Sequence, residues 1–218
     1  MHDLLADWQT RLVALATASS GDDGAHDINH LHRVWHVARE LMSDTPEADP
    51  MIVLAAAYLH DIVNLPKDHP ERSNASRHAA MRACERLRDV GFPPEKLEGV
   101  AHAIEAHSFS AAIMPTTIEA KIVQDADRLD ALGAVGLARL FYTAGRMGSA
   151  LAHADDPLAT RRPLDDRTYA LDHIDRKLAT LPGTMQTAAG RRLGEERLGW
   201  LRAFRDTFVH EWGAASPS

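Results

Sequence analysis

Residues 49–61 read DPMIVLAAAYLHD, and this stretch decides the fold. Asp49 is a good N-cap residue and Pro50 suits the first position of a helix, so a helix is predicted to begin here. The run that follows, MIVLAAAYL, is apolar on every face, which is typical of a helix buried at the centre of a domain. His60 and Asp61 end this helix, so the pair is expected to lie deep in the protein.

The rest of the chain also has helical periodicity, and no run alternates between apolar and polar residues as a half-buried strand would. Thr116 and Glu119 match a capping box, which predicts a long helical stretch from there to about residue 147. Further helices are predicted near residues 4–15, 27–41, 73–90, 94–107, 166–181 and 185–212. We therefore predict an all-α protein, a helical bundle forming a single domain over residues 1–218.

Composition excludes several classes of protein. With 45% hydrophobic and 25% charged residues, the 218-residue chain is neither disordered nor collagen-like. Its net charge of −7 lacks the positive field that duplex nucleic acid would attract, so nucleic acid is not an expected partner. Cys84 is the single cysteine, which excludes an intramolecular disulfide and favours a reducing compartment. Without a signal peptide or an apolar stretch of ~20 residues, the protein is expected to be cytoplasmic, with no membrane partner.

Imidazole and carboxylate groups gather in three places along the chain. His30 lies in HDINHLHRV, the pair His60 and Asp61 ends the buried helix, and Asp127 lies in DADRLDALGA. Such groups are the ligands of Zn, Mn, Fe or Mg ions. A metal ion would compensate the cost of burying an ionised Asp61. The alternative is that Asp61 only ends the helix and that His60 is a hydrogen-bonded core histidine.

The order of the three motifs, HD-x-x-H-x-x-R-V, LHD and DADRLDALGA, resembles that of the HD-domain superfamily of metal-dependent phosphohydrolases. The resemblance covers about residues 26–147 and implies a metal-binding core there, with C-terminal helices of about 165–212 packed on it. The tail, with RPLDDRTYALDH and LPGTMQTA, looks like that of small bacterial HD hydrolases close to the nucleotide pyrophosphohydrolases.

The resemblance also implies a divalent metal ion, Mn, Mg, Ni, Fe or Zn, and names its ligands. These ligands are His30, His60, Asp61 and Asp127. Asp125 and Asp130 compete with Asp127, but the family ligand is the aspartate of the Ala-Asp-Arg-Leu string, which is Asp127. Asp130, one turn further on, is then a candidate acceptor for hydrogen bonds from the ligands.

The chain departs from the family where acidic residues follow the HD pair in several members. In HDIVNL the corresponding positions are Asn64 and Leu65, which cannot act as a base. We therefore expect the attacking hydroxide to come from metal-bound water, with Asp61 among the catalytic residues. His102 or His107, from AHAIEAHSFS, is expected to serve proton transfer or phosphate contact. Because these two histidines are five residues apart in one helix, they point to different sides, and only one is expected to enter the site.

His107 has a second interpretation, because two-metal relatives carry an additional ligand in an Ile-x-x-His string, here Ile104 to His107. His78 is a further ligand candidate, so one ion or two are both compatible with the sequence. Phosphate contacts are predicted for basic residues, each of which also suits an ordinary surface charge. These residues are Arg33, Lys67, Arg72, Lys121, Arg128, Arg161 and Arg162.

The resemblance favours a phosphorylated small molecule, a nucleotide, as the substrate. Cleavage of a (deoxy)nucleoside triphosphate to monophosphate and pyrophosphate is the first hypothesis. A nucleoside monophosphate phosphatase, removal of pyrophosphate from a guanosine alarmone and a non-catalytic metal or nucleotide sensor are the alternatives. The apolar faces of the last two helices suit a homodimer contact as well as an intramolecular one.

Overall fold

The computed structural model describes residues 2–18, 28–63, 71–108 and 111–213. Within these ranges the regular structure is helical, apart from one isolated bridge between Ala150 and Tyr169, which confirms the all-α prediction. No helix in the described part of the chain combines the length and the apolar content that crossing a membrane requires. The chain divides into two compact units, residues 1–127 and 128–218, which are described separately. The single domain stays a prediction.

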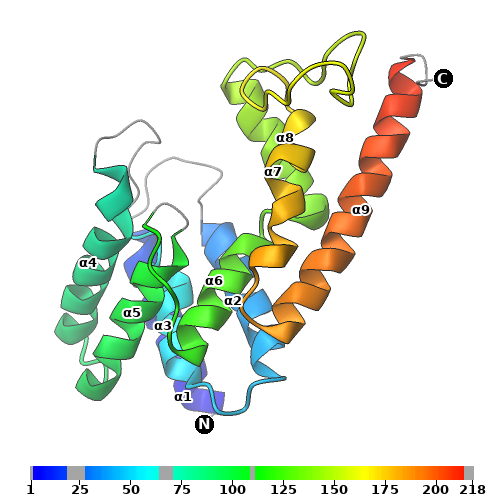
Figure 1. Cartoon of the computed structure of the whole chain (residues 1–218). Helices are drawn as coiled ribbons and strands as arrows, with labels where there is room; N and C mark the ends of the chain where they lie inside the picture. The colour runs from blue at the N-terminus through cyan, green and yellow to red at the C-terminus, as the bar shows by residue number, and fades with distance from the viewer. Residues whose placement is uncertain (1, 19–27, 64–70, 109–110, 214–218) are drawn as a thin grey trace. The chain divides into compact units, whose positions relative to one another are not determined.

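The first unit is built around α3 (Pro50–Leu59), where eight of the ten residues are buried. Three helices pack against it: α1 (His2–Thr17), α2 (Ile28–Met42) and α5 (Leu97–His107) (Figure 1). A further helix, α4 (Ala75–Asp89), packs against α5. Burial of an apolar helix by its neighbours is the main source of stability in such a unit, and it fixes the end of α3 at the unit's interior.

The predicted start of α3 is confirmed. Pro50 is its first residue, and the Asp49 side chain accepts a hydrogen bond from the amide of Met51 at 2.9 Å. Lys96 forms an ion pair with the same carboxylate. The amide of Asp49 in turn donates to Glu119 Oε1 at 3.0 Å, which ties this helix start to a residue 70 positions later.

The predicted capping box between Thr116 and Glu119 is wrong. Thr117 takes the capping position instead, because its Oγ1 accepts a hydrogen bond from the amide of Ala120 at 3.2 Å. The carboxylate of Glu119 is used by Asp49 on another segment, so it serves a tertiary contact rather than its own helix.

The long stretch predicted to end near residue 147 is two helices, α6 (Ile118–Leu129) and α7 (Gly133–Arg146). Gly133 has a φ of +73°, a left-handed backbone conformation that glycine adopts without a Cβ clash. The chain turns over residues 130–132 before this glycine, so the apolar pattern continues while the helix does not.

The second unit contains α7, the short α8 (Asp172–Arg176) and the long α9 (Ala188–Trp212), with α7 packed against α9. Thr187 caps α9, since its Oγ1 accepts a hydrogen bond from the amide of Gly190 at 2.9 Å. The helix predicted over 166–181 is mostly absent, because Asp165 Oδ1 accepts from two following backbone amides and holds a turn there.

Candidate metal centre

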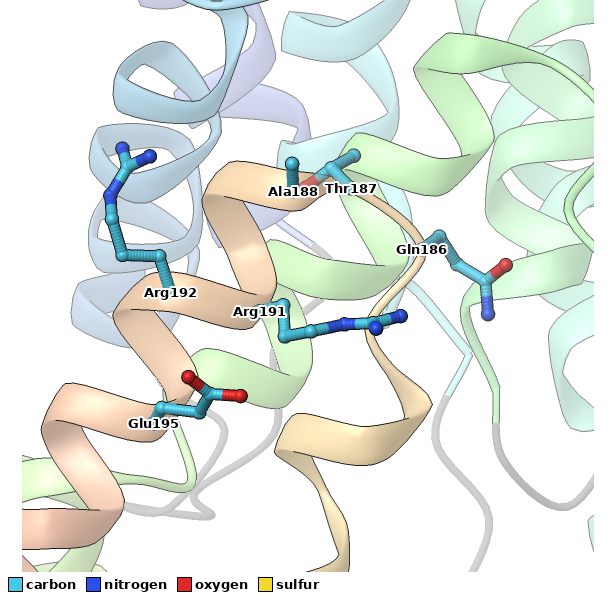
Figure 2. A pocket seen from close by; sticks show the side chains of 6 residues that line it. All are labelled: Gln186, Thr187, Ala188, Arg191, Arg192 and Glu195. Atoms are coloured by element: carbon cyan, nitrogen blue, oxygen red, sulfur yellow. The ribbon is translucent and has the colours of Figure 1, made fainter.

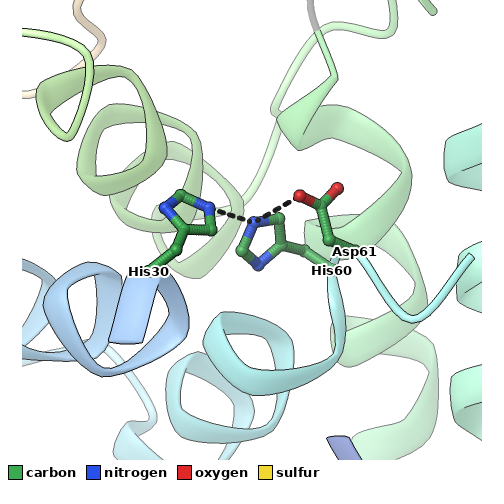
Figure 3. Close-up of side chains that lie close together, drawn as sticks. All are labelled: His30, His60 and Asp61. Atoms are coloured by element: carbon green, nitrogen blue, oxygen red, sulfur yellow. Dashed lines mark hydrogen bonds and ion pairs between the residues drawn. The ribbon is translucent and has the colours of Figure 1, made fainter. Parts of the chain in front are cut away.

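Three imidazoles and two carboxylates meet in the first unit, each delivered by a helix end or a helix face. His30 comes from α2, His60 and Asp61 from the end of α3, His107 from the last residue of α5, and Asp127 from α6. In Figure 3 the His60 ring lies between the His30 ring and the Asp61 carboxylate. The central buried helix therefore supplies the middle of the cluster, and three neighbouring segments complete it.

The donor atoms of the cluster lie at ligand-to-ligand spacing. His30 Nε2 is 3.3 Å from His60 Nε2 and 3.4 Å from Asp127 Oδ1. His60 Nε2 is 3.7 Å from both Asp127 Oδ1 and Asp61 Oδ2, and His107 Nε2 is 3.7 Å from Asp61 Oδ1. Ligands that each stand about 2.0–2.2 Å from one cation are separated by ~3–3.5 Å, so the spacing fits a divalent ion with little adjustment.

Two of the rings are held with their lone pairs turned toward the cluster. His60 Nδ1 donates to the carbonyl oxygen of Ala57 at 3.0 Å, and His107 Nδ1 donates to that of Ile104 at 2.6 Å. A carbonyl oxygen only accepts, so the proton of each neutral ring resides on Nδ1 and Nε2 carries the lone pair. This second hydrogen bond is how proteins orient histidine ligands of metals.

The electrostatics of the cluster suit a cation. Burial lowers the pKa of His60 to about 4, helped by the neighbouring histidines and opposed by Asp61 and Asp127, so the ring is neutral at pH 7. Burial alone would raise the pKa of Asp127, but the hydrogen bond with His30 and the charges of the nearby imidazoles hold it well below its usual range. The Asp127 carboxylate is therefore ionised, beside a neutral nitrogen donor.

His107 behaves differently from His60, although both rings are buried. Burial lowers the pKa of His107, but its hydrogen bond to Asp61 and the negative charges of Asp61 and Asp127 outweigh burial, and the pKa is raised overall. When the cluster holds no cation, a proton on His107 is thus favoured by the carboxylates that a metal ion would otherwise neutralise.

Gln124 is a supporting residue that the sequence analysis missed. It is buried on α6, one turn before Asp127, and its Nε2 donates to the carbonyl oxygen of Ala106 at 2.6 Å. Ala106 directly precedes His107, so this hydrogen bond links the segments that carry two members of the cluster. The available signal was a glutamine directly after the apolar pair Ile122 and Val123.

A small cavity adjoins the cluster. Its described wall consists of His60, Asp61, Val63, Ala75, Ser76, His107 and Ser108. About 20 Å³ of it is open to the centre of a water molecule, which is room for one water or one oxygen-sized group. The cluster thus has a neighbouring space on the side where α4 begins.

The structure separates the two candidate proton-transfer histidines, as their spacing in one helix predicted. His107 is in the cluster, whereas His102 lies outside the groups of metal-type residues in the described part of the chain. His102 Nε2 accepts a hydrogen bond from the amide of Thr116 at 3.0 Å and is 2.9 Å from its Oγ1. His78 is exposed on α4 and is also outside these groups.

Among the three competing aspartates, Asp127 is the one that the structure brings to the cluster. Asp125 is buried but outside both groups of metal-type residues found in the described ranges. Asp130 forms an ion pair with Arg139 inside the second unit, so its carboxylate serves the start of α7.

Several basic residues predicted to bind phosphate make hydrogen bonds within the second unit. Arg162 makes two hydrogen bonds to the buried carboxylate of Asp172, at 2.5 and 2.8 Å. Arg161 Nη2 donates to the carbonyl oxygen of Asp155 at 2.8 Å. Arg128 Nη1 donates to that of Thr184 at 2.9 Å. The sequence shows these basic residues but not the oxygen atoms to which they donate hydrogen bonds.

The remaining basic candidates belong to the first unit. Arg33 lies on α2 one turn after His30, and Lys121 lies on α6; both are half-buried. Lys67 falls outside the described residues, as do Asn64 and Leu65 of the HDIVNL string, and the side chain of Arg72 is not described either.

A larger hollow lies in the second unit, at the start of α9. It is lined by Gln186, Thr187, Ala188, Arg191, Arg192 and Glu195. In Figure 2 the Arg191 side chain extends toward Gln186, while that of Arg192 extends to the opposite side. The described lining contains one carboxylate and no imidazole, so this hollow lacks the donor set of a metal site.

Comparison with known proteins agrees with the geometry of the cluster. The family model of the HD domain matches residues 27–132, which include all five residues of the cluster. YpgQ of Bacillus subtilis is 34% identical over 187 residues, covering 84% of this chain and 82% of YpgQ.

Solved structures of similar proteins extend the likeness to both units. An HD-superfamily hydrolase from Bacillus thuringiensis is 27% identical, with a TM-score of 0.74 over 97% of this chain and 100% of that one. The structure of Bacillus subtilis YpgQ in complex with ADP is 30% identical, with a TM-score of 0.70 over 95% of this chain and 94% of that one. This chain therefore belongs to the HD-domain superfamily of metal-dependent hydrolases.

Proposed function

We propose that this protein hydrolyses a nucleotide at the cluster, converting a (deoxy)nucleoside triphosphate to the monophosphate and pyrophosphate. The observation that carries the proposal is the convergence of imidazole and carboxylate donors at 3.3–3.7 Å in a buried site. A nucleotide is favoured over other phosphate esters because the related YpgQ has been solved with ADP. A nucleoside monophosphate phosphatase remains the alternative.

His30, His60, Asp61 and Asp127 would hold the divalent ion. The donor set, its spacing and the neutral state of His60 fit such an ion, and HD domains bind divalent metals. When bound, the ion supplies polarisation of a phosphoryl group and lowers the pKa of water. Mn, Mg, Ni, Fe and Zn all accept these ligands, so the identity of the ion has to be determined by metal-binding experiments.

The chain's own residues orient the reactants and take up the proton. We assign proton uptake to His107 Nε2, which faces Asp61 Oδ1 at 3.7 Å and whose ring is fixed through Ile104. The oxygen of a water molecule bonds to the α-phosphorus, and the bond from that phosphorus to the oxygen bridging to the β-phosphate breaks. One proton of the water passes to His107, and pyrophosphate leaves with the bridging oxygen.

The test is a release assay with chelator-stripped protein and added Mn, Mg, Ni or Zn. Nucleoside tri-, di- and monophosphates are supplied, and phosphate and pyrophosphate are measured separately. Equal amounts of pyrophosphate and monophosphate from one triphosphate class would support the proposal. Phosphate from monophosphates would favour the alternative. No release with any metal, although the protein binds metal stoichiometrically, would indicate a sensor.

Two variants locate the reaction at the cluster. Asp61→Ala removes a ligand from the middle of the site, and we expect it to lose both bound metal and turnover. His78→Gln is the matched control, because His78 is an exposed histidine on the neighbouring helix and should keep both. Full turnover with retained metal in Asp61→Ala would refute the assignment of the site.

A further inference from the structure

Ser76 occupies a core position with a hydroxyl group that the described fold leaves unused. It belongs to the buried face of α4, which consists of Ala75, Ser76, Ala79, Ala80, Ala83, Cys84 and Leu87. Its side chain is 2% exposed, and its Oγ has no hydrogen-bond partner among the described residues. Because an unpaired buried hydroxyl destabilises a fold, a bound ligand that accepts its hydrogen bond would account for this serine.

The space beside Ser76 is the cavity that adjoins the metal cluster. Ala75 and Ser76 form part of its wall, together with Asp61 and His107. The hydroxyl therefore shares a cavity with a predicted metal ligand and with the predicted proton acceptor.

The backbone around Ser76 is also suited to an anion. Ala75 and Ser76 are the first two residues of α4, a helix of 15 residues that directly follows the 3-10 turn Arg72–Asn74. The side chain of Asn74 does not cap this helix; its Oδ1 accepts a hydrogen bond from Arg77 Nη1 at 3.2 Å instead. The positive end of the helix dipole lies at this end of α4 and favours negatively charged oxygen nearby.

We propose that the Ser76 hydroxyl and the first turn of α4 bind one phosphoryl oxygen of the substrate next to the metal cluster. The cavity admits one oxygen-sized group, which matches a single phosphoryl oxygen better than a whole phosphate. Such an oxygen would lie in the cavity that Ser76 shares with Asp61 and His107. The inference rests on the proposed function in that it takes the substrate to be a phosphate ester.

The experiment compares Ser76→Ala with the wild type, both loaded with Mn. Pyrophosphate and inorganic phosphate are the probes, with their Kd measured by calorimetry and kcat/KM measured on the best triphosphate. Loss of a hydrogen bond to a charged oxygen should weaken pyrophosphate binding and kcat/KM by about 10- to 100-fold. Ser73→Ala is the control, because Ser73 is exposed three residues earlier.

Thermal unfolding of the ligand-free protein is a second measurement, in which the proposal predicts no loss of stability. Because the hydroxyl has no partner in the described fold, Ser76→Ala should leave the Tm unchanged or raise it while ligand binding weakens. A lower Tm with unchanged pyrophosphate affinity would show a structural hydroxyl and overturn the proposal. Ser76→Cys, of nearly the same shape and a weak donor, repeats the binding test if the alanine variant does not fold.

The results separate this inference from the proposed function. Weaker pyrophosphate binding in Ser76→Ala, with no turnover of any nucleotide by the wild type, would support the subsite and refute hydrolysis. Normal turnover in the wild type, with unchanged Kd, KM and kcat in Ser76→Ala, would refute the subsite alone.

Discussion

The Nε2 atoms of His30 and His60 lie 3.3 Å apart, and both rings are almost completely buried. The proton of the neutral His60 ring is used by the carbonyl of Ala57, so the lone pair of His60 points at His30. Such a contact is favourable when a proton or a cation occupies the space between the nitrogens. Asp127, 3.4 Å from His30 Nε2, adds the negative charge that favours a divalent cation.

Metal binding should therefore stabilise the fold measurably. A ligand at 100 times its Kd contributes about 2.7 kcal/mol to the free energy of unfolding. We expect Mn²⁺ to raise the Tm of the wild type and to have no effect on His60→Gln, as measured by calorimetry. His36→Gln, at an exposed position on α2, should respond like the wild type. A Mn²⁺-dependent rise in His60→Gln would contradict the ligand assignment.

Gln124→Met should weaken metal binding without removing a ligand. The variant keeps the buried volume but deletes the donor to Ala106, and we expect a loss of about 1–3 kcal/mol in stability. Because His107 follows Ala106, Mn²⁺ affinity should fall about 10-fold, within the range for groups that orient ligands. Titration calorimetry measures this, and Gln186→Met, at an exposed glutamine, is the control. Unchanged affinity would mean that His107 is positioned independently of Gln124.

Arg162→Ala should destabilise the second unit. Asp172 has a fully buried side chain and is paired by two hydrogen bonds with Arg162, so the variant leaves an uncompensated carboxylate. Breaking such a pair costs about 3–5 kcal/mol, measurable by urea unfolding. The double variant Arg162→Met with Asp172→Leu should recover much of that loss. Reduced nucleotide affinity with full stability in Arg162→Ala would instead restore its predicted role in phosphate binding.

Asp156 should make stability depend on pH in the acid range. It is buried and accepts hydrogen bonds from Thr160 and Arg161, which overcome the effect of burial and lower its pKa to about 2. Because the folded pKa lies below the unfolded value of about 3.9, this contribution to stability is complete above about pH 5 and is lost as the pH falls toward 2.

The measurement is the unfolding midpoint between pH 2 and pH 5. Asp156→Asn should be less stable than the wild type at pH 5, and the difference should shrink toward pH 2. Asp155→Asn is the matched control at the neighbouring exposed position. A difference that stays constant over this pH range would show that ionisation of Asp156 is not the cause.

Local chemistry made part of the fold predictable. Asp49 and Pro50 start α3 because their effects act within one turn, and an all-apolar helix can only be buried. The division between α6 and α7 escaped prediction because the apolar pattern continues through Gly133, whose left-handed conformation depends on packing. Glu119 was assigned to its own helix, but its partner is Asp49, and sequence spacing carries no information about that contact.

In the candidate site, too, some residues could be predicted from the sequence and others could not. The grouping of His30, His60, Asp61 and Asp127 could be predicted because their motifs resemble those of the HD family in residue type and order. Ser76 and Gln124 were not found, since neither belongs to a motif and the role of each depends on which helices meet there. Arg162 was predicted to bind phosphate because the sequence does not show its partner. That partner, Asp172, is ten positions away along the chain.

The wide spacing of the cluster along the chain also sets the order of events during synthesis. Asp127 emerges about 100 residues after His30, which at about 5–20 residues per second takes roughly 5–20 s. During that time a nascent chain has imidazoles but not the complete cage. Apolar burial around α3 can therefore begin to gather the helices before the last predicted ligand has been synthesised.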